Sequence, residues 1–600
     1  MELAQRNLRA CLVLLRTLMD QGLALVVVCP GSRSGPLAVA AGLLEPQGLA
    51  LRTALDERSA AFFGLGWSRA QGRPAAVITT SGTAVANLLP AVVEADYGAI
   101  PLLLLTADRP VGLKGCGANQ TVNQEMFLAA NVRWLGCSPP EGLAAAEPDQ
   151  IRELAQRAMA YSLGIAGQQT PSLAAPGPVH LNLAFAEPLH ASGGVLLAEA
   201  FGVLTAPGLA SAAGPAATTG PLPAQGISSP IPPGLAGLDP DRPGVVVAGP
   251  WRGMPGQWQG FEVGLRRWHK RTGWPLLADF LSGLRGLPGL GQINGYDLLL
   301  EAAGAPLETC QVLRLGPLPA SRRLQRWLEQ IQGHQVLVSQ GDPRNLNPLG
   351  GDCVQTSMGL EAWLDQLPEA LWSQPASETC TAQAALWQQR EQRLQLQLGQ
   401  ALSGSGLNEP ALARQLSQLL PAGVPLVLAN SSPVRDWESF SDPAAPARQV
   451  FAFRGASGID GTLSLACGVA DALGSAVLVT GDLALLHDSH GWLWRQQLAG
   501  RLTVVLLNNN GGGIFEQLPI RPEPGQAMDF ERLFAMPQQV VPLALAAAYG
   551  VPGRRCRQAI NLPADLEWAL GQPLALLELG TDRRSDALLR QQLRKMCQTT

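Results

Sequence analysis

Two short apolar runs near the C-terminal end of the chain each lead into polar residues that could bind a cation. The run at 476–479 is followed by Asp482, and the run at 502–507 leads into three asparagines, with Asn509 in the middle, and then three glycines. A helical segment is expected between the two runs, at about 489–498. Short apolar runs on either side of one helix predict parallel strands joined by a crossover. Because ligands of such sheets bind beyond the carboxyl ends of the strands, these polar residues are expected to lie together.

Asp482 and Asn509 supply a carboxylate and an amide oxygen, which are the hard ligands that Mg²⁺ takes alongside phosphate oxygens. The glycines at 511–513 let backbone amides approach a diphosphate, and a helix N-terminus just beyond them would favour its negative charge. Either motif alone is more often an ordinary Asp turn or Asn/Gly turn. Two of them, each after a buried strand, favour a site for a diphosphate and Mg²⁺.

The same stretch resembles the diphosphate-binding motif of thiamine-diphosphate enzymes, which reads GDG and, further along, NN. Leu483 departs from that motif, since it stands where the motif has its second glycine. GDL followed by NNNGGGIF is most similar to one family of these enzymes, the 2-succinyl-5-enolpyruvyl-6-hydroxy-3-cyclohexene-1-carboxylate (SEPHCHC) synthases of menaquinone biosynthesis. The resemblance covers most of residues 20–190 and 410–520 and is thin between 200 and 400.

Length and composition limit the other possibilities. A chain of 600 residues exceeds what one core supports, which predicts three domains. With 46% hydrophobic and 15% charged residues and a net charge of −4, the chain is globular and does not suggest a nucleic-acid partner. The ten cysteines form no CxxC pair, which suits a reducing cytoplasm. No apolar run reaches the roughly 20 residues of a membrane helix, and the first residues read as an amphipathic helix rather than a signal peptide.

In the N-terminal part, strand-like runs at 25–29, 75–79 and 101–105 alternate with helical segments, which predicts a doubly wound α/β domain. Glu57 stands at the start of a buried helix, where an acid normally only compensates the helix dipole. Arg33 follows the first run and could equally be a solvated loop residue. The order of these elements resembles the pyrimidine-binding domain of thiamine-diphosphate enzymes, in which a glutamate ahead of an SGT-type loop contacts the cofactor.

We therefore predict an α/β protein with three doubly wound parallel-sheet domains of the thiamine-diphosphate enzyme type. The pyrimidine-binding domain is expected at 1–200, the middle domain at 240–375 and the diphosphate-binding domain at 409–600. Residues 201–239 have the Pro/Ala/Gly-rich composition of a linker, and 376–408 read as a helical connection. In the family, the middle domain is structural and contributes little to the chemistry.

The resemblance implies thiamine diphosphate as cofactor and Mg²⁺ as metal, with Mn²⁺ as an alternative. It implies Glu57 as the catalytic residue, which would hydrogen-bond the aminopyrimidine ring and is expected to be buried with a raised pKa. Ile459 would separate the two cofactor rings, although ordinary core packing explains it equally. The cofactor-binding residues implied are Glu57, Ser81, Gly82, Ile459, Asp482, Asn509 and Gly511, of which the last three would hold the metal.

The family decarboxylates 2-oxoglutarate and adds the resulting succinyl semialdehyde carbanion to isochorismate. Both substrates carry two carboxylates, which arginines bind bidentately. Any one of the arginines below could instead form a surface salt bridge, and no residue of the middle domain is assigned. The substrate-binding residues implied are Ser32, Arg33, Arg109, Asn119, Gln120, Asn430, Ser431, Arg435 and Arg454, with Ile514, Phe515 and Leu518 as an apolar wall.

We expect a cytoplasmic homodimer, with a homotetramer as the alternative, because Glu57 and Asp482 belong to domains that meet across a subunit boundary in this superfamily. The expected partners are the two small-molecule substrates, without nucleic acid or membrane. The nearest alternative is another thiamine-diphosphate carboligase or a 2-oxoacid decarboxylase, although the middle domain shows no dinucleotide fingerprint for a flavin. A non-catalytic scaffold would need none of Glu57, Asp482 and Asn509. The sequence does not separate menaquinone from phylloquinone as the end product.

Overall fold

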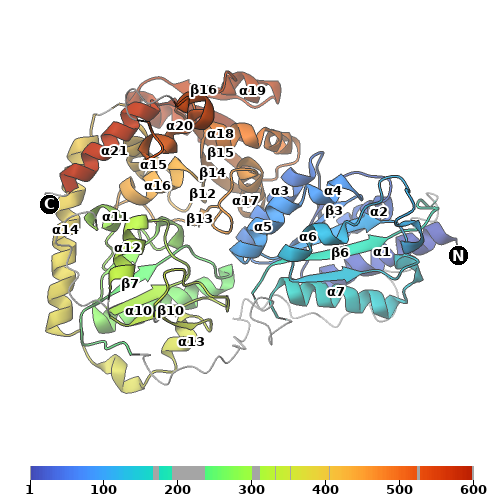
Figure 1. Cartoon of the computed structure of the whole chain (residues 1–600), viewed down its shortest axis with the longest axis horizontal. Coiled ribbons are helices and arrows are strands. Elements are labelled where there is room, and N and C mark those ends of the chain that lie inside the picture. Colours follow the sequence, from blue (N-terminus) through green and yellow to red (C-terminus); the bar gives the residue numbers. More distant parts are fainter. Residues whose placement is uncertain are drawn as a thin grey trace.

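A computed structural model describes residues 2–165, 175–191, 237–300 and 311–597, apart from 332, 352, 405 and 523–527. The predicted linker at 201–239 therefore lies almost wholly outside the described residues. Three α/β units are visible in Figure 1, each built around its own parallel sheet. The three sheets fall within the ranges expected for the three domains, and the fold class predicted from the sequence is confirmed.

The N-terminal unit has a six-stranded sheet in the order β2-β1-β3-β4-β6-β5, and all its strands run parallel. Its helices lie on both faces of the sheet, because right-handed crossovers change face where the strand order reverses. The strands are β1 (Leu25–Val28), β2 (Ala50–Thr53), β3 (Ala75–Thr79), β4 (Leu102–Asp108), β5 (Trp134–Cys137) and β6 (Pro178–Ala184), and the helices are α1 (Leu3–Asp20), α2 (Gly35–Leu44), α3 (Glu57–Gln71), α4 (Thr83–Ala86), α5 (Leu89–Gly98), α6 (Glu125–Leu128) and α7 (Pro148–Ser162).

The C-terminal unit repeats this plan with the order β13-β12-β14-β15-β17-β16. In both outer sheets the strand order reverses between the first and third strands, which is where ligands of such sheets bind. The strands are β12 (Leu426–Leu428), β13 (Val450–Phe451), β14 (Ser475–Gly481), β15 (Arg501–Asn508), β16 (Gly553–Cys556) and β17 (Leu574–Gly580), and the helices are α15 (Glu409–Leu419), α16 (Ser432–Phe440), α17 (Thr462–Leu473), α18 (Asp482–His487), α19 (Pro542–Ala548), α20 (Leu562–Leu570) and α21 (Arg583–Cys597).

The middle unit has a five-stranded parallel sheet in the order β11-β10-β9-β7-β8. The long helix α14 (Glu378–Leu402) then runs along the edge of the molecule and leads into the C-terminal unit (Figure 1). The strands are β7 (Gly244–Ala248), β8 (Leu276–Ala278), β9 (Gln311–Leu315), β10 (Gln335–Val338) and β11 (Cys353–Thr356), and the helices are α10 (Trp258–Thr272), α11 (Tyr296–Leu299), α12 (Arg322–Gln330) and α13 (Leu360–Leu364).

Two local predictions hold in position but not in helix type. The α-helix after β14 begins at Asp482 itself, and the segment expected to be helical at 489–498 is a 3₁₀ helix, η8 (Ser489–Gln496). The break falls at Asp488, whose buried carboxylate accepts hydrogen bonds from the Ser464 backbone N–H and hydroxyl, and these tie the chain to α17. The helix expected beyond the glycines is also only a short 3₁₀ turn, η9 (Gly513–Gln517). None of the helices in the described ranges has the length and apolar character that crossing a membrane requires.

The outer units meet through α3 and α17, which cross in close contact at the centre of the molecule (Figure 1). Glycines make this approach possible, since a Cβ on Gly66 would lie 2.2 Å from the Leu465 carbonyl oxygen and one on Gly468 would lie 2.0 Å from that of Phe63. The ring of Phe63 also stacks on Trp494 at a centroid distance of 4.0 Å. Because the obstructing atoms are backbone, the helices themselves would have to separate to admit a larger residue.

The substitution Gly66→Ala is therefore expected to lower the free energy of unfolding by about 1–3 kcal/mol, as overpacking of a tight contact does. Gly42→Ala is the matched control, because Gly42 is an exposed glycine of α2 with no atom within 4 Å of its added Cβ. That change should stabilise the protein by about 0.4–1 kcal/mol. Urea unfolding of both variants measures the difference, and equal effects would mean that the α3–α17 contact tolerates a methyl group.

Candidate active site

A cavity of about 370 Å³ opens at the reversal point of the C-terminal sheet, between β12 and β14. Asn430, Asp482 and Asn509 line it from the carboxyl ends of β12, β14 and β15. Strands β14 and β15 pair in parallel from Ser475 with Arg501 to Gly481 with Leu507, so their ends reach the same edge. The structure thus brings together the polar residues that the sequence predicted would meet.

Asp482 is nearly buried, with 7% of its surface exposed. Its Oδ2 accepts a hydrogen bond of 2.7 Å from the Gly511 backbone N–H, and its Oδ1 accepts one of 3.0 Å from the N–H of Leu483. Burial raises the pKa of this carboxyl to about 6, because desolvation outweighs the two hydrogen bonds, and the charge of Glu409 acts in the same direction as burial. A cation beside Asp482 would offset that desolvation.

Asn509 presents a free amide oxygen at the same place. Its Nδ2 donates to Glu409 Oε1 at 2.5 Å, while its buried Oδ1 has no hydrogen-bond partner among the described residues. Gly511 adopts φ +127°, and an added Cβ would lie 2.2 Å from the Ala535 carbonyl oxygen, so only glycine fits this turn. The Gly511 carbonyl accepts from the Gly513 N–H at 2.9 Å and retains a second lone pair.

These oxygens fit a hard divalent cation. In the described residues no group of three or more His, Cys, Asp or Glu side chains could hold a metal by itself. Mg²⁺ does not need such a group, because it is commonly bound by one or two protein oxygens together with phosphate oxygens and water. Asp482, Asn509 Oδ1 and the Gly511 carbonyl are thus suited to a cation that a bound diphosphate completes.

Positive side chains gather at the same cavity. Arg435 and Arg454 both line it, and desolvation, followed by the charges of Arg454 and Arg322, lowers the pKa of Arg435. Arg322 begins α12 of the middle unit, and no sequence motif assigned it to the site. The only signal was its place in the segment PASRR that follows β9. Two arginines that line one cavity, with the charge of Arg322 acting on one of them, favour anionic ligands.

The cavity also offers neutral hydrogen-bonding groups and an apolar wall. Asn430 Oδ1 and Ser432 Oγ are buried, and neither has a partner within the described ranges. Ser431 turns the chain with φ 74°, and its carbonyl accepts from Arg435 at 2.6 Å. The apolar lining includes Ile459, Leu483, Leu507, Ile514, Phe515 and Leu518, and so contains all the wall residues predicted from the sequence.

The loop that carries Arg454 and Ile459 is held by both other units. Glu94 of α5 accepts hydrogen bonds from the backbone N–H groups of Gly455, Ala456 and Ser457 at 2.7, 2.7 and 3.1 Å. A Cβ on Gly455 would lie 2.5 Å from the Glu94 carbonyl oxygen, so the glycine permits this close contact.

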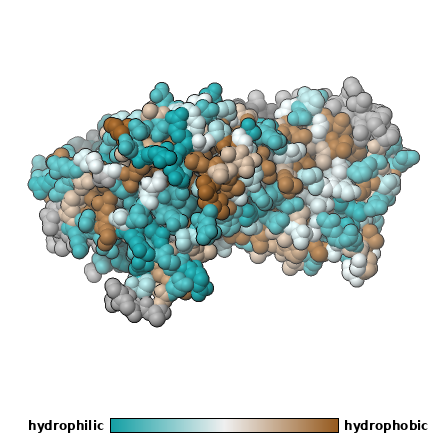
Figure 2. Space-filling view, turned by 90° about the horizontal axis from the view of Figure 1, so that it is seen from above, coloured by the Kyte–Doolittle hydropathy of each residue, from teal (hydrophilic) through white to brown (hydrophobic). Residues whose placement is uncertain are grey.

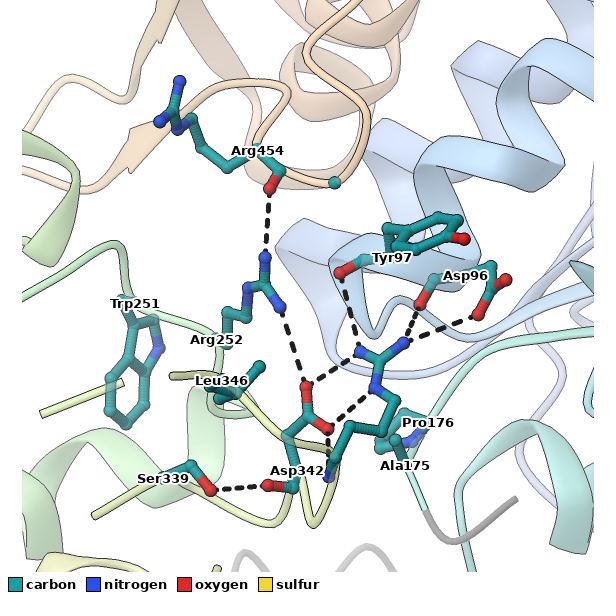
Figure 3. A network of polar contacts seen from close by, with 12 residues as sticks. Asp96, Tyr97, Ala175, Pro176, Trp251, Arg252, Ser339, Asp342, Leu346 and Arg454 are labelled. Carbon is teal, nitrogen blue, oxygen red and sulfur yellow. Dashed lines mark hydrogen bonds and ion pairs between the residues drawn. The ribbon is translucent and has the colours of Figure 1, made fainter. Parts of the chain in front are cut away.

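From the middle unit, Arg252 donates to the Arg454 carbonyl at 3.0 Å, while the Arg454 side chain points away from it (Figure 3). Arg252 also pairs with Asp342 at 3.6 Å. Asp342 in turn pairs with Arg344, which donates to the Asp96 carbonyl at 2.7 Å. The position of Arg454 thus depends on contacts that join all three units.

The residues predicted from the N-terminal unit form a separate cluster, since every residue lining the cavity comes from 409–518. Arg109 donates to Ser81 Oγ at 2.5 Å and to the Gln120 carbonyl at 2.8 Å. Gln120 Nε2 donates back to the Ser81 carbonyl at 2.8 Å, and a Cβ on Gly82 would lie 3.0 Å from the Gln120 side chain. Arg33 is already paired with Glu187 at 2.7 Å.

Three further predicted residues are accessible in the single chain. Ser32 and Asn119 are exposed. Glu57 is only partly buried, and its Oε2 accepts a hydrogen bond of 3.2 Å from Asn87 Nδ2. Glu57 therefore lacks, within one chain, the full burial that its expected role requires.

Comparisons with known proteins agree with this architecture. Residues 9–129 match the family model described as "Thiamine pyrophosphate enzyme, N-terminal TPP binding domain", and residues 240–428 match the "Middle domain of thiamine pyrophosphate". The chain is 54% identical to the 2-succinyl-5-enolpyruvyl-6-hydroxy-3-cyclohexene-1-carboxylate synthase of Synechococcus sp. (strain RCC307), over 98% of this chain and 97% of that protein. Synthases of the same name from Parasynechococcus marenigrum (strain WH8102) and Prochlorococcus marinus (strain MIT 9313) are 52% and 48% identical, over 96% of this chain and 98% and 97% of their own lengths.

Proposed function

Because this chain belongs to the 2-succinyl-5-enolpyruvyl-6-hydroxy-3-cyclohexene-1-carboxylate synthases, we propose that it makes that compound in menaquinone or phylloquinone biosynthesis. It is a thiamine-diphosphate-dependent transferase. The reaction releases CO₂ from 2-oxoglutarate and joins the remaining four-carbon unit to isochorismate. The observation that carries this proposal is the family membership over nearly the full length, together with a cavity that combines Asp482, Asn509 and the two arginines Arg435 and Arg454.

The diphosphate and its metal are assigned to the C-terminal unit. Asp482, Asn509 Oδ1 and the Gly511 carbonyl would hold Mg²⁺, with Mn²⁺ as a substitute, and the unpartnered Asn509 oxygen supports this assignment. Thiamine diphosphate supplies, when bound, a reactive carbon that accepts the 2-oxoacid and stabilises negative charge after CO₂ leaves. The protein's part is to anchor the cofactor, orient the acids and exclude water.

The arginines are assigned to the substrate carboxylates. Arg435 and Arg454 line the cavity, the charge of Arg322 acts on Arg435, and a guanidinium binds a carboxylate with two parallel hydrogen bonds. Asn430 and Ser432 contribute unpartnered polar atoms for the remaining oxygens. Ile514, Phe515 and Leu518 line the apolar side of the cavity.

The pyrimidine half of the site is assigned to a second copy of the chain. Glu57 does not line the cavity of its own chain, so a homodimer, or a dimer of dimers, would complete each site with the cluster of Ser32, Arg33, Ser81, Gly82, Arg109, Asn119 and Gln120. Figure 2 shows apolar residues gathered near the middle of one face of the molecule. Leu55 and Leu493, which are 77% and 40% exposed, lie on segments joined by the 2.7 Å contact of Asp56 with His490. Exposed apolar side chains of this kind support an interface.

The direct test is to incubate the protein with thiamine diphosphate, Mg²⁺, 2-oxoglutarate and isochorismate and to identify the product by mass. A product with the mass of 2-succinyl-5-enolpyruvyl-6-hydroxy-3-cyclohexene-1-carboxylate is expected. Release of free succinate semialdehyde with isochorismate left unchanged would instead indicate a simple 2-oxoacid decarboxylase.

Arg435→Ala and Arg454→Ala should each raise the KM for one or both acids by roughly tenfold or more, since a hydrogen bond to a charged group contributes about 1.5–3 kcal/mol. Arg322→Ala should act in the same direction. Arg152→Ala is the matched control, because Arg152 pairs with the exposed Asp149 on α7, outside the cavity lining. Steady-state kinetics with each acid varied in turn measures the effect, and unchanged KM values for both acids would make these arginines structural.

The affinity for Mn²⁺ in the presence of thiamine diphosphate should fall with pH below about 6. The pKa of Asp482 is raised to about 6, so protons compete with the cation below that pH and do not compete above it. One proton displaced by one cation corresponds to roughly tenfold in affinity per pH unit. Titrations followed by electron paramagnetic resonance at pH 5 to 7.5 measure it. Asp482→Ala lacks this carboxylate, so its remaining pH dependence reports the titration of the cofactor's own diphosphate. If the wild type and Asp482→Ala show the same dependence of Mn²⁺ affinity on pH, Asp482 is not a ligand.

Glu57→Gln should stay folded and bind the cofactor, yet slow deuterium exchange at the cofactor's C2 by about 10²–10⁴-fold, as loss of acid–base assistance does. Glu45→Gln, at an exposed position, should leave exchange unchanged.

Mixing inactive Glu57→Gln with inactive Asp482→Ala tests the shared site. In a mixed homodimer one of the two sites combines the native Glu57 of one chain with the native Asp482 of the other. About a quarter of wild-type activity should therefore return after subunit exchange. No recovery after subunit exchange would place both residues within one chain.

A further inference from the structure

We propose that Glu409 is a positioning residue for the cation site, because it decides which end of the Asn509 amide faces the cavity. This proposal rests on the function proposed above. Glu409 is the first residue of α15 and is 1% exposed. Its Oε1 accepts a hydrogen bond of 2.5 Å from Asn509 Nδ2, and both residues line the cavity.

The chemistry of the pair leaves one orientation. An ionised carboxylate only accepts hydrogen bonds, whereas an amide has a donating and an accepting end. Asn509 must therefore turn its NH₂ group to Glu409, and this leaves Oδ1 as the unpartnered atom at the site. In the opposite orientation two oxygens would face each other, and the cavity would be offered an NH₂ group that no cation can use.

The second oxygen of Glu409 is held by Arg590 of α21, which also donates to Asp436 Oδ1 at 2.7 Å. Arg590 is 4% exposed, so this ion pair is shielded from water and fixes the Glu409 side chain in position. The negative charges of Asp436 and Glu409 raise the pKa of the Arg590 guanidinium against the opposing effect of its burial. Glu409 is thus held behind Asn509, with one oxygen accepting from Arg590 and the other from Asn509.

The same C-terminal helix supports the rest of the turn. Arg583 donates to the Asn510 carbonyl at 2.8 Å and pairs with Glu516 at 3.0 Å. Helix α21 therefore contacts the segment 509–516 directly through Arg583 and indirectly through Arg590 and Glu409. None of these three residues belongs to the sequence motif that identified the site.

A purely structural role is the competing explanation. An acid at the start of a helix compensates the dipole, and breaking a buried ion pair is destabilising in itself. Both effects would change stability without changing cation binding in the folded protein. The experiment must therefore separate the orientation of Asn509 from the stability of the fold.

Glu409→Gln replaces a carboxylate, which accepts hydrogen bonds with both oxygens, with an amide that donates at one end. The introduced glutamine gives its oxygen to Arg590, which only donates, and so turns its NH₂ towards Asn509. Asn509 then has to offer Oδ1 to that group and its own NH₂ to the cavity. We expect the affinity for Mn²⁺, measured by electron paramagnetic resonance with thiamine diphosphate present, to fall by about 10–100-fold, which is the usual effect of changing a residue behind a metal ligand.

The paired variant Glu409→Gln/Asn509→Asp should restore binding to within a few-fold of wild type. The introduced aspartate accepts from the glutamine NH₂ and presents an oxygen to the cation whichever way it turns, and the total charge of the pair is unchanged. Glu391→Gln is the control for loss of a buried carboxylate, since Glu391 is 6% exposed and accepts from the Gly295 N–H, and neither residue lines the cavity. It should alter the melting temperature but leave Mn²⁺ affinity unchanged.

Two results would overturn the proposal: Glu409→Gln binding Mn²⁺ as tightly as wild type, or the paired variant binding no better than Glu409→Gln alone. A loss of affinity that follows the melting temperature across all variants would also count against it. These outcomes differ from failure of the proposed function, in which the wild-type protein itself would show no cofactor-dependent Mn²⁺ binding and Asp482→Ala would change nothing.

Discussion

The parallel pairing of β14 with β15 is the constraint on which the site depends. Because the two strands run side by side in register, Asp482 and the turn at 509–511 emerge at one edge of the sheet. The hydrogen bond from the Gly511 N–H to Asp482 then joins the two strand ends directly. This bond requires glycine at position 511, because the backbone conformation there and the closeness of Ala535 leave no room for a side chain. A different neighbour for either strand would separate the two halves of the cation site.

The site contains polar and charged groups whose hydrogen bonds or charges the folded chain alone does not compensate. Asp482 is buried with a raised pKa, Asn509 and Asn430 each keep an amide oxygen without a partner in the described part of the chain, and arginines of like charge face one cavity. Each of these features costs folding free energy, because buried polar groups and like charges are unfavourable without partners. A ligand that brings a cation, phosphates and carboxylates would satisfy all of them together, which explains why they lie in one place.

The middle unit contributes more to the site than its lack of a recognisable motif suggested. The positive charge of Arg322 helps to lower the pKa of Arg435, and Arg252 donates a hydrogen bond to the backbone carbonyl of Arg454. Glu94 of the N-terminal unit binds the same loop through three backbone N–H groups. The substrate side of the cavity is thus built from contacts among all three units. The cation side depends on the C-terminal unit alone, with α21 behind it.

The sequence by itself determined the fold class, the strands that precede Asp482 and Asn509, and the chemistry of the residues at their ends. Apolar runs and glycine turns are local signals, and parallel strands of such sheets meet at one edge by a general rule. Only the tertiary structure decided which side chains support them. Glu409 and Arg590 lie far from Asn509 in the chain, so no spacing could reveal their contacts, and the charge that acts on Arg435 from Arg322 comes from another unit. The break of the helix at Asp488 was likewise decided by a long-range bond to Ser464, which local periodicity does not contain.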